Sequence, residues 1–207
     1  MDTPRVRQRA DFGRWWHAGW LIAAAALLVF PDLALAHQAG AAGGLASGFA
    51  HPILGADHLV AMVAVGLWGA FLGQPAIWLL PVVFPFVMAL GALLGINGVA
   101  LPAVEMSIAG SALAFGAVVA LALRPPLWLA AVLVGAFALF HGHAHGTELP
   151  QAVNPLAYGV GFVVATGLLH LSGITLGLLA RWPAGVRVVR FAGIAIACAG
   201  LYFLSGA

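Results

Sequence analysis

The strongest constraint on the fold of this chain is a succession of six long apolar stretches that carry almost no charge. Each is close to the ~20 residues that an α-helix needs to cross about 30 Å of hydrocarbon. Of the 207 residues, 63% are hydrophobic and 7% are charged, whereas soluble domains have about 25% charged residues. The sequence therefore predicts an all-α, polytopic transmembrane helical bundle with six spans, over residues 48–73, 76–95, 101–123, 126–143, 153–180 and 185–205.

Glycines at i, i+4 spacing recur within these stretches. The pairs are Gly69/Gly73, Gly91/Gly95 and Gly173/Gly177. In lipid, small residues at this spacing let two helix backbones approach closely. We expect the pairs to mark helix contacts, although the abundant use of glycine in membrane helices is an equal alternative for any single pair.

Residues 1–36 are predicted to be a cleavable secretory signal peptide. A positively charged region, which contains Arg5, Arg7, Arg9 and Arg14, precedes a short apolar region over Ala18–Phe30. Pro31 ends that helix, and Ala34-Leu35-Ala36 forms an A-x-A cleavage site. Retention of this segment as a first span is the alternative. Cleavage would make His37 the N-terminal residue, on the outer side of the membrane.

The arginines predict which side of the membrane each loop occupies. If residues 37–207 start outside and cross six times, the loops near 74–75, 124–126 and 181–190 are inside. The inner loops then hold all the basic residues of this part, which are Arg124, Arg181, Arg187 and Arg190. This distribution agrees with the excess of arginine and lysine in cytoplasmic loops.

The few acidic residues beyond position 36 accompany the histidines. Asp57 lies in HPILGADH (51–58), Glu148 in HGHAHGTE (141–148), and Glu105 opens the third stretch. Ionisable groups at bilayer depth cost about 2.5–3.5 kcal/mol each, so they mark ion pathways more often than not. In the predicted topology, three separate stretches bring these groups to the outer face.

Helical periodicity refines the placement of the histidines. At 100° per residue, His141, His145 and Glu148 lie on one stripe. His143 points away from it, unless the flanking Gly142 and Gly146 end the helix there. His51 and His58 share a face, and Asp57 lies off it. Pro52 and Gly55, however, make a regular helix doubtful in this first motif.

Imidazoles and carboxylates without a thiolate predict a site for a divalent transition metal that is bound and then released. Imidazole suits Zn, Cu, Fe and Ni, while structural zinc sites usually use sulfur. Ligation needs neutral imidazoles and ionised carboxylates, so uptake should weaken in acid. The metal is the substrate, and no prosthetic group is expected. The predicted metal residues are His37, His51, Asp57, His58, Glu105, His141, His143, His145, Glu148 and His170.

His170 lies near the middle of the fifth stretch, away from the other histidines. It is interpreted either as a second metal position or proton relay, or as a structural residue bonded to Thr166 one turn earlier. Ser107 and Ser111 are interpreted as hydrogen-bond donors that orient the Glu105 carboxylate.

Four blocks of this sequence closely resemble the HupE/UreJ family of nickel permeases. They are HPILGADHLVAMVAVGLWGA (51–70), VEMSIAGS (104–111), FHGHAHGTE (140–148) and GFVVATGLLHLSGI (161–174). The resemblance implies a bacterial inner-membrane protein that supplies nickel, or else cobalt, for hydrogenase or urease maturation, with maturation proteins as partners. It also implies that residues 37–207 form a metal-transport domain and that the predicted metal residues, His37 apart, carry the transport, since each occupies a motif position.

Other classes of function receive less support from the sequence. No GxxxxGK[ST] loop is present, so ATP hydrolysis by a P-loop is not expected. Nucleic-acid binding is not expected either, because no basic patch with interleaved aromatic residues occurs. Two alternatives to transport are an intramembrane metalloenzyme and a non-transporting metal-binding accessory subunit. The absence of an HExxH signature counts against the first, and the absence of a soluble effector domain counts against the second.

Overall fold

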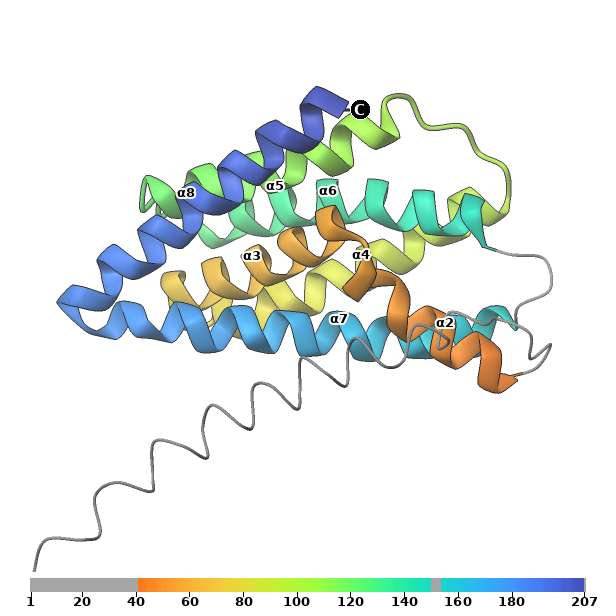
Figure 1. Ribbon diagram of the computed structural model, residues 1–207, viewed down its shortest axis with the longest axis horizontal. Helices are drawn as coiled ribbons and strands as arrows, with labels where there is room; N and C mark the ends of the chain where they lie inside the picture. The colour runs from red at the N-terminus through yellow and green to blue at the C-terminus, as the bar shows by residue number, and fades with distance from the viewer. Residues whose placement is uncertain (1–40, 150–153, 207) are drawn as a thin grey trace, which may run out of the picture. The chain divides into compact units, whose positions relative to one another are not determined.

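The computed structural model describes residues 41–149 and 154–206, and the predicted signal peptide and His37 lie outside these ranges. The described part is helical and contains no strand, so the predicted all-α fold is confirmed. The helices, drawn in Figure 1, are α2 (Ala41–Leu54), α3 (Ala56–Leu72), α4 (Ala76–Ile96), α5 (Val104–Ala120), α6 (Leu127–Glu148), α7 (Pro155–Gly177), the short 3₁₀ helix η2 (Leu178–Arg181) and α8 (Pro183–Gly206).

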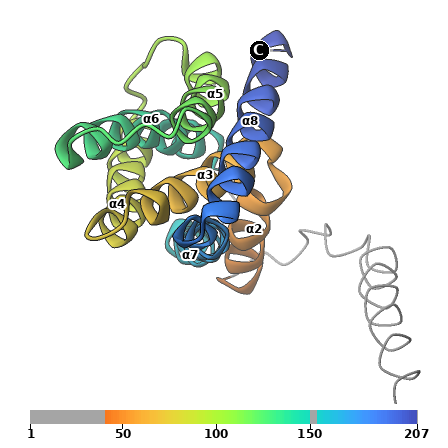
Figure 2. The same cartoon turned by 90° about the vertical axis from the view of Figure 1, so that its left-hand side faces the viewer.

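Helix α3 is the central element of the bundle. It contacts α4, α5, α7 and α8, which surround it in the end-on view of Figure 2. Its sequence is apolar on every side, as expected for a helix that is buried all round. Met62, Leu67 and Trp68 of this helix are completely buried. The middle and C-terminal part of α3 is therefore enclosed by the neighbouring helices, and at its N-terminal end His58 is buried while Asp57 is half-buried.

The outer helices present large apolar side chains on their exposed faces, among them Trp78 and Phe86 of α4, Trp128 of α6 and Phe191 of α8. Soluble proteins rarely expose apolar surface of this extent, whereas lipid requires it. Among the described residues, α4, α6, the α7–η2 segment and α8 are each long and apolar enough to cross a membrane. These features define a helical membrane protein.

The expected first span, 48–73, is not one continuous helix, and the doubt that Pro52 and Gly55 raised about a regular helix here is confirmed. The chain breaks at Gly55, and the axes of α2 and α3 differ by 78°. Gly55 has an extended backbone, with φ −76° and ψ 105°. Pro52, three residues earlier, has no N–H to donate to the carbonyl of the preceding turn. If this bent pair is one broken span, the number of candidate spans rises from four to five.

Two further boundaries differ from the sequence prediction. Helix α6 does not end at residue 143 but continues to Glu148, so its histidines lie inside the helix. Helix α5 is apolar but has 17 residues, fewer than the expected 101–123. Ala103 before it and Ala122 after it both have positive φ, which stops regular helix at each end. Six spans are therefore not established by helix length alone.

Glycines bring α4 and α6 into close contact. A Cβ at Gly91 would overlap the carbonyl oxygen of Leu139, and a Cβ at Gly142 would overlap that of Met88. The expectation for Gly91/Gly95 is therefore confirmed, as is that for Gly173/Gly177, which lie against α3. The expectation for Gly69/Gly73 holds for Gly69 alone. A Cβ at Gly69 would lie 3.0 Å from the carbonyl oxygen of Ala76 in α4, whereas Gly73 ends α3 with a φ of 87° and a Cβ there would meet nothing within 4 Å.

Arginines gather at the end of the bundle opposite the N-terminus of α3. The Arg124 guanidinium lies 4.4 Å from the ring centre of Phe71, in the last turn of α3. Arg190 of α8 donates to the carbonyl of Ala120 at the C-terminus of α5, with an N–O distance of 2.8 Å. Fourteen residues of α3, about 21 Å at 1.5 Å per residue, separate Phe71 from Asp57. The basic and acidic groups thus occupy opposite ends.

Candidate metal site

Three histidines from three helices meet at the break between α2 and α3. His51 comes from the last turn of α2, His58 from the first turn of α3, and His145 from the last turn of α6. One ring nitrogen from each lies within 4.8 Å of the other two. Nitrogens that share one first-row ion at about 2.0–2.1 Å lie roughly 3–3.5 Å apart, so small ring movements suffice to complete the set. The break at Gly55 permits this meeting because it turns α2 away from α3.

His58 is oriented by the residue that precedes it. Oδ1 of Asp57 lies 2.8 Å from the Nδ1 of His58 and also accepts the His58 backbone N–H at 2.8 Å. A carboxylate can only accept, so Nδ1 carries the ring proton and Nε2 keeps its lone pair. Such carboxylate–histidine pairs fix the orientation of metal ligands and raise their basicity. Asp57 would thus act on a bound metal through His58.

Unpaired polar atoms in the described part of the chain are concentrated on histidines. Seven buried side-chain nitrogen or oxygen atoms have no hydrogen-bond partner there, and six of them are imidazole nitrogens. They include Nε2 of His58 and both ring nitrogens of His145. A buried polar atom without a partner costs about 1–3 kcal/mol. Each neutral ring keeps one lone pair, so the unpaired nitrogens of His58 and His145 suit a cation.

Aromatic rings enclose the three-histidine group on the side of α7. The Phe162 ring centre lies 4.3 Å from that of His145, and Tyr158 lies 6.1 Å from His51. Both are buried. These apolar walls keep bulk water away from the nitrogens, which strengthens their interaction with a charge. No pattern in the sequence pointed to these two residues, because they lie outside the histidine motifs.

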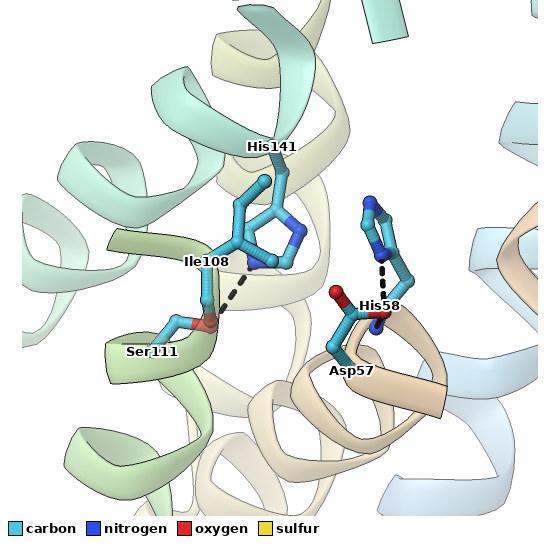
Figure 3. A network of polar contacts seen from close by, with 5 residues as sticks. All are labelled: Asp57, His58, Ile108, Ser111 and His141. Atoms are coloured by element: carbon cyan, nitrogen blue, oxygen red, sulfur yellow. Dashed lines mark hydrogen bonds and ion pairs between the residues drawn. The ribbon is translucent and has the colours of Figure 1, made fainter. Parts of the chain in front are cut away.

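His141 lies one turn before His145 and beside the three-histidine group. Its ring centre is 4.8 Å from that of His58 (Figure 3), and it is completely buried. Its Nε2 lies 3.0 Å from the hydroxyl of Ser111 on α5. The sequence interpretation that Ser107 and Ser111 orient Glu105 is wrong. Ser107 donates to Ala103 of its own helix, and Ser111 donates to Ile108 and contacts His141.

His143 lies apart from the group, in the direction that helical periodicity indicated. Its Nε2 bonds the carbonyl oxygen of Val99, in the segment between α4 and α5, at 2.6 Å. The proposal that Gly142 and Gly146 end the helix is wrong, because both lie against α4 and α6 continues past them. These glycine contacts turn His141 and His145 toward α3 and leave His143 outside.

His170 of α7 is buried among apolar residues beyond Phe84. The ring centre of Phe84 lies 5.6 Å from that of His141 and 5.5 Å from that of His170. His170 bonds the backbone of Pro81, which has a carbonyl but no N–H. The alternative of a bond to Thr166 is wrong, since the Thr166 hydroxyl has no partner among the described residues. The Nε2 of His170 is likewise unpaired.

The two remaining acidic residues lie at the same end of the bundle. Glu105 is exposed in the first turn of α5. With Asp57 it lines a pocket of about 400 Å³, which is also lined by Tyr202, Phe203 and Ser205 of α8. Glu148 is the last residue of α6, and its side chain lies outside the described part. Asp57 therefore faces both this pocket and the histidines.

Fold and site together define a helical membrane protein with a buried polyhistidine group. Comparison with known proteins identifies its relatives. The sequence model of the family described as HupE / UreJ protein matches residues 25–203. Protein HupE of Rhizobium leguminosarum bv. viciae is 47% identical over 181 residues, which cover 87% of this chain and 95% of that protein. The chain belongs to the HupE/UreJ family. No solved structure matches it.

Proposed function

We propose that this protein is a permease of the bacterial inner membrane that imports a divalent transition metal, Ni²⁺ in first place and Co²⁺ in second. The observation that carries the proposal is the meeting of His51, His58 and His145, from three helices, inside an apolar bundle. Nitrogen donors with a nearby carboxylate and no thiolate suit borderline ions such as Ni²⁺. The family resemblance implies that the metal serves hydrogenase or urease maturation.

The proposed topology has six crossings, with the histidines toward the periplasm. The bent α2–α3 pair is then one broken span, and α5, with 17 residues, is a short one, at the lower limit of about 17 residues for a spanning helix. The arginine end of the bundle supports a cytoplasmic position for Arg124 and Arg190, because loops rich in arginine stay inside. Broken helices at membrane depth are tolerated where they line a site, which supports a binding role for the break at Gly55.

The proposed path runs from the pocket at Glu105 and Asp57, through the histidine group, toward His170. Two carboxylates facing one pocket attract a cation from the periplasm. The inside-negative potential then favours inward movement by about 2.3 kcal/mol per charge per 100 mV, and by about twice that for a divalent ion. Import by this route needs no nucleotide.

Reconstitution in lipid vesicles tests the proposal. Vesicles containing the wild-type protein should accumulate radioactive Ni²⁺ faster than protein-free vesicles. The variant His58→Ala should lose at least about 100-fold of this flux, and Asp57→Ala about 10- to 100-fold, the usual cost of losing a residue that orients a metal ligand. Ser172→Ala is the matched control. This exposed hydroxyl donates only to carbonyls of its own helix.

Three outcomes separate the alternatives. Flux that survives both variants would contradict the site. Saturable Ni²⁺ binding by the wild-type protein without any flux would instead support a metal-binding accessory subunit. Metal-dependent hydrolysis of a lipid or peptide without flux would support an intramembrane enzyme.

A further inference from the structure

The three-histidine group has a fourth buried imidazole, His141, beside it. His51 and His145 meet His58 at the break between α2 and α3. His141 meets His58 from the interior side, where its ring stands nearly perpendicular to that of His58, at 87°. Figure 3 shows His141 between Ser111 on one side and His58 on the other.

The hydroxyl of Ser111 determines which nitrogen of His141 carries the proton. Ser111 donates its one hydrogen to the carbonyl of Ile108, at 2.6 Å. Its contact with Nε2 of His141 at 3.0 Å is then a bond in which the ring donates and the hydroxyl oxygen accepts. Nε2 therefore carries the proton. Nδ1 keeps a lone pair, and this atom is buried without a partner among the described residues.

His58 and His141 are thus held in the same way. Each ring donates one N–H to a fixed oxygen, of Asp57 and of Ser111 respectively, and keeps the other nitrogen unpaired. The rings differ in depth. On the side of His141 that faces the interior, the Phe84 ring lies between His141 and His170 and contacts both. The pair lies between the outer histidines and the apolar interior.

We propose that His58 and His141 form an inner metal site, which takes the cation from the outer group of His51, His58 and His145. His58 belongs to both sites, so the ion exchanges its ligands without losing all of them. This matters because an unpaired charge inside an apolar bundle is very costly. Ser111 is the positioning residue that keeps the lone pair of His141 available. The inference rests on the permease function proposed above.

The variants Ser111→Ala and Ser111→Thr test the inference, with Ser172→Ala as the control. Alanine removes the acceptor for the His141 N–H, while threonine keeps it. We expect Ser111→Ala to reduce Ni²⁺ flux into vesicles about 10-fold, the lower limit for losing a residue that orients a ligand. Its Ni²⁺ Kd, measured by calorimetry on purified protein, should stay within about twofold because the outer group is intact. Ser111→Thr and Ser172→Ala should keep the flux within about threefold.

Nitrogen NMR of the histidine side chains gives a readout that a purely structural role of Ser111 would not move. In the wild-type protein, the signals of His141, assigned with His141→Gln, should show the proton on Nε2. Ni²⁺ should broaden its Nδ1 signal. Ser111→Ala should give a mixture of the two tautomers and weaker broadening of His141, with the His58 signals still broadened.

Each outcome decides the inference. A wild-type His141 that carries its proton on Nδ1 overturns it without any variant, even if Ser111→Ala fails to fold. Flux in Ser111→Ala equal to that of the wild-type protein also overturns it. If the wild-type protein binds Ni²⁺ but passes none, the permease function fails, and the inner site is then judged by whether Ni²⁺ broadens His141.

Discussion

The two histidine motifs of this protein both contain glycine, and the glycines have opposite effects on the helices. In the first motif, Gly55 lies where the helix ends, and α2 and α3 diverge by 78°. In the second, Gly142 and Gly146 lie within the C-terminal part of an unbroken α6. The first motif therefore supplies His51 and His58 from two helices, while the second supplies its ligands from one.

Neighbouring elements account for this difference. Around Gly55 the backbone is extended, and a Cβ there would meet only atoms at 3.4 Å, from Asp57, His51 and His58. Gly142 and Gly146 instead have the backbone of α4 against them, and added Cβ atoms would overlap the carbonyls of Met88 and Ala92. A glycine among histidines thus breaks a helix in one place and brings two helices together in the other.

The largest expected effect separates two histidines of the second motif. His145→Ala removes one of the three converging ligands and should weaken Ni²⁺ binding by about 100-fold or more, beyond the roughly 10- to 100-fold cost of losing a residue that only orients a ligand. His143→Ala, two residues away, removes only the bond to Val99 and should change the Kd less than about threefold. Calorimetric Ni²⁺ titration of both purified variants measures the difference. An equal loss of Ni²⁺ affinity in the two variants would show that α6 does not direct His145 into the three-histidine group and His143 away from it.

A change in the packing of α6 should produce the next largest effect. Gly142→Ala places a methyl group against the Met88 carbonyl and should lower the free energy of unfolding by about 1–3 kcal/mol, the usual cost of overpacking. Gly135→Ala on the same helix is the control. Its Cβ would meet only Val83 and Val87 side chains, at 3.8 and 3.6 Å.

The control variant should be neutral or more stable by up to about 1 kcal/mol, because alanine favours the helix over glycine. Thermal unfolding in detergent, followed by circular dichroism, reports both changes. If Gly142→Ala were as stable as Gly135→Ala, α4 and α6 would not pack as closely as the structure has them.

The smallest effect is expected at the break in the first motif. Gly55→Ala introduces no overlap, but alanine favours a helical backbone by about 1 kcal/mol. This preference opposes the extended conformation that separates α2 from α3. We expect Ni²⁺ affinity to fall about threefold with little change in the melting temperature. Gly167→Ala, whose Cβ would meet nothing within 4 Å, is the control. An unchanged affinity would mean that Pro52 and the surrounding helices maintain the bend without Gly55.

Hydropathy alone located most of the fold. The stretches 76–95 and 185–205 correspond closely to α4 and α8, because a run of apolar residues of this length has few alternatives in lipid. The same reasoning failed at Gly55 and at the end of α6. A glycine is compatible with both a helix end and a close helix contact. Which of the two occurs depends on the helix that packs against it, and a hydropathy pattern carries no information about that helix.

The site was predictable as a set of residue types and only partly as a geometry. The motifs indicated His51, His58 and His145, and helical periodicity separated His143 from them. The contact between Ser111 and His141 joins residues 30 positions apart on different helices. No local spacing relates them, so the sequence instead suggested Glu105 as the partner of Ser111. Contacts of this kind arise from the packing of α5 against α6.

Pro81 and Pro85 of α4 couple position 85 to His170, which is distant in sequence. Pro85 has no N–H, so it leaves the carbonyl of Pro81, four residues earlier, without its helical donor, and His170 takes that place. Any other residue at position 85 would bring an amide that competes with the imidazole for the same oxygen. Positions 85 and 170 are therefore coupled: the effect of a substitution at one of them on stability depends on which residue occupies the other.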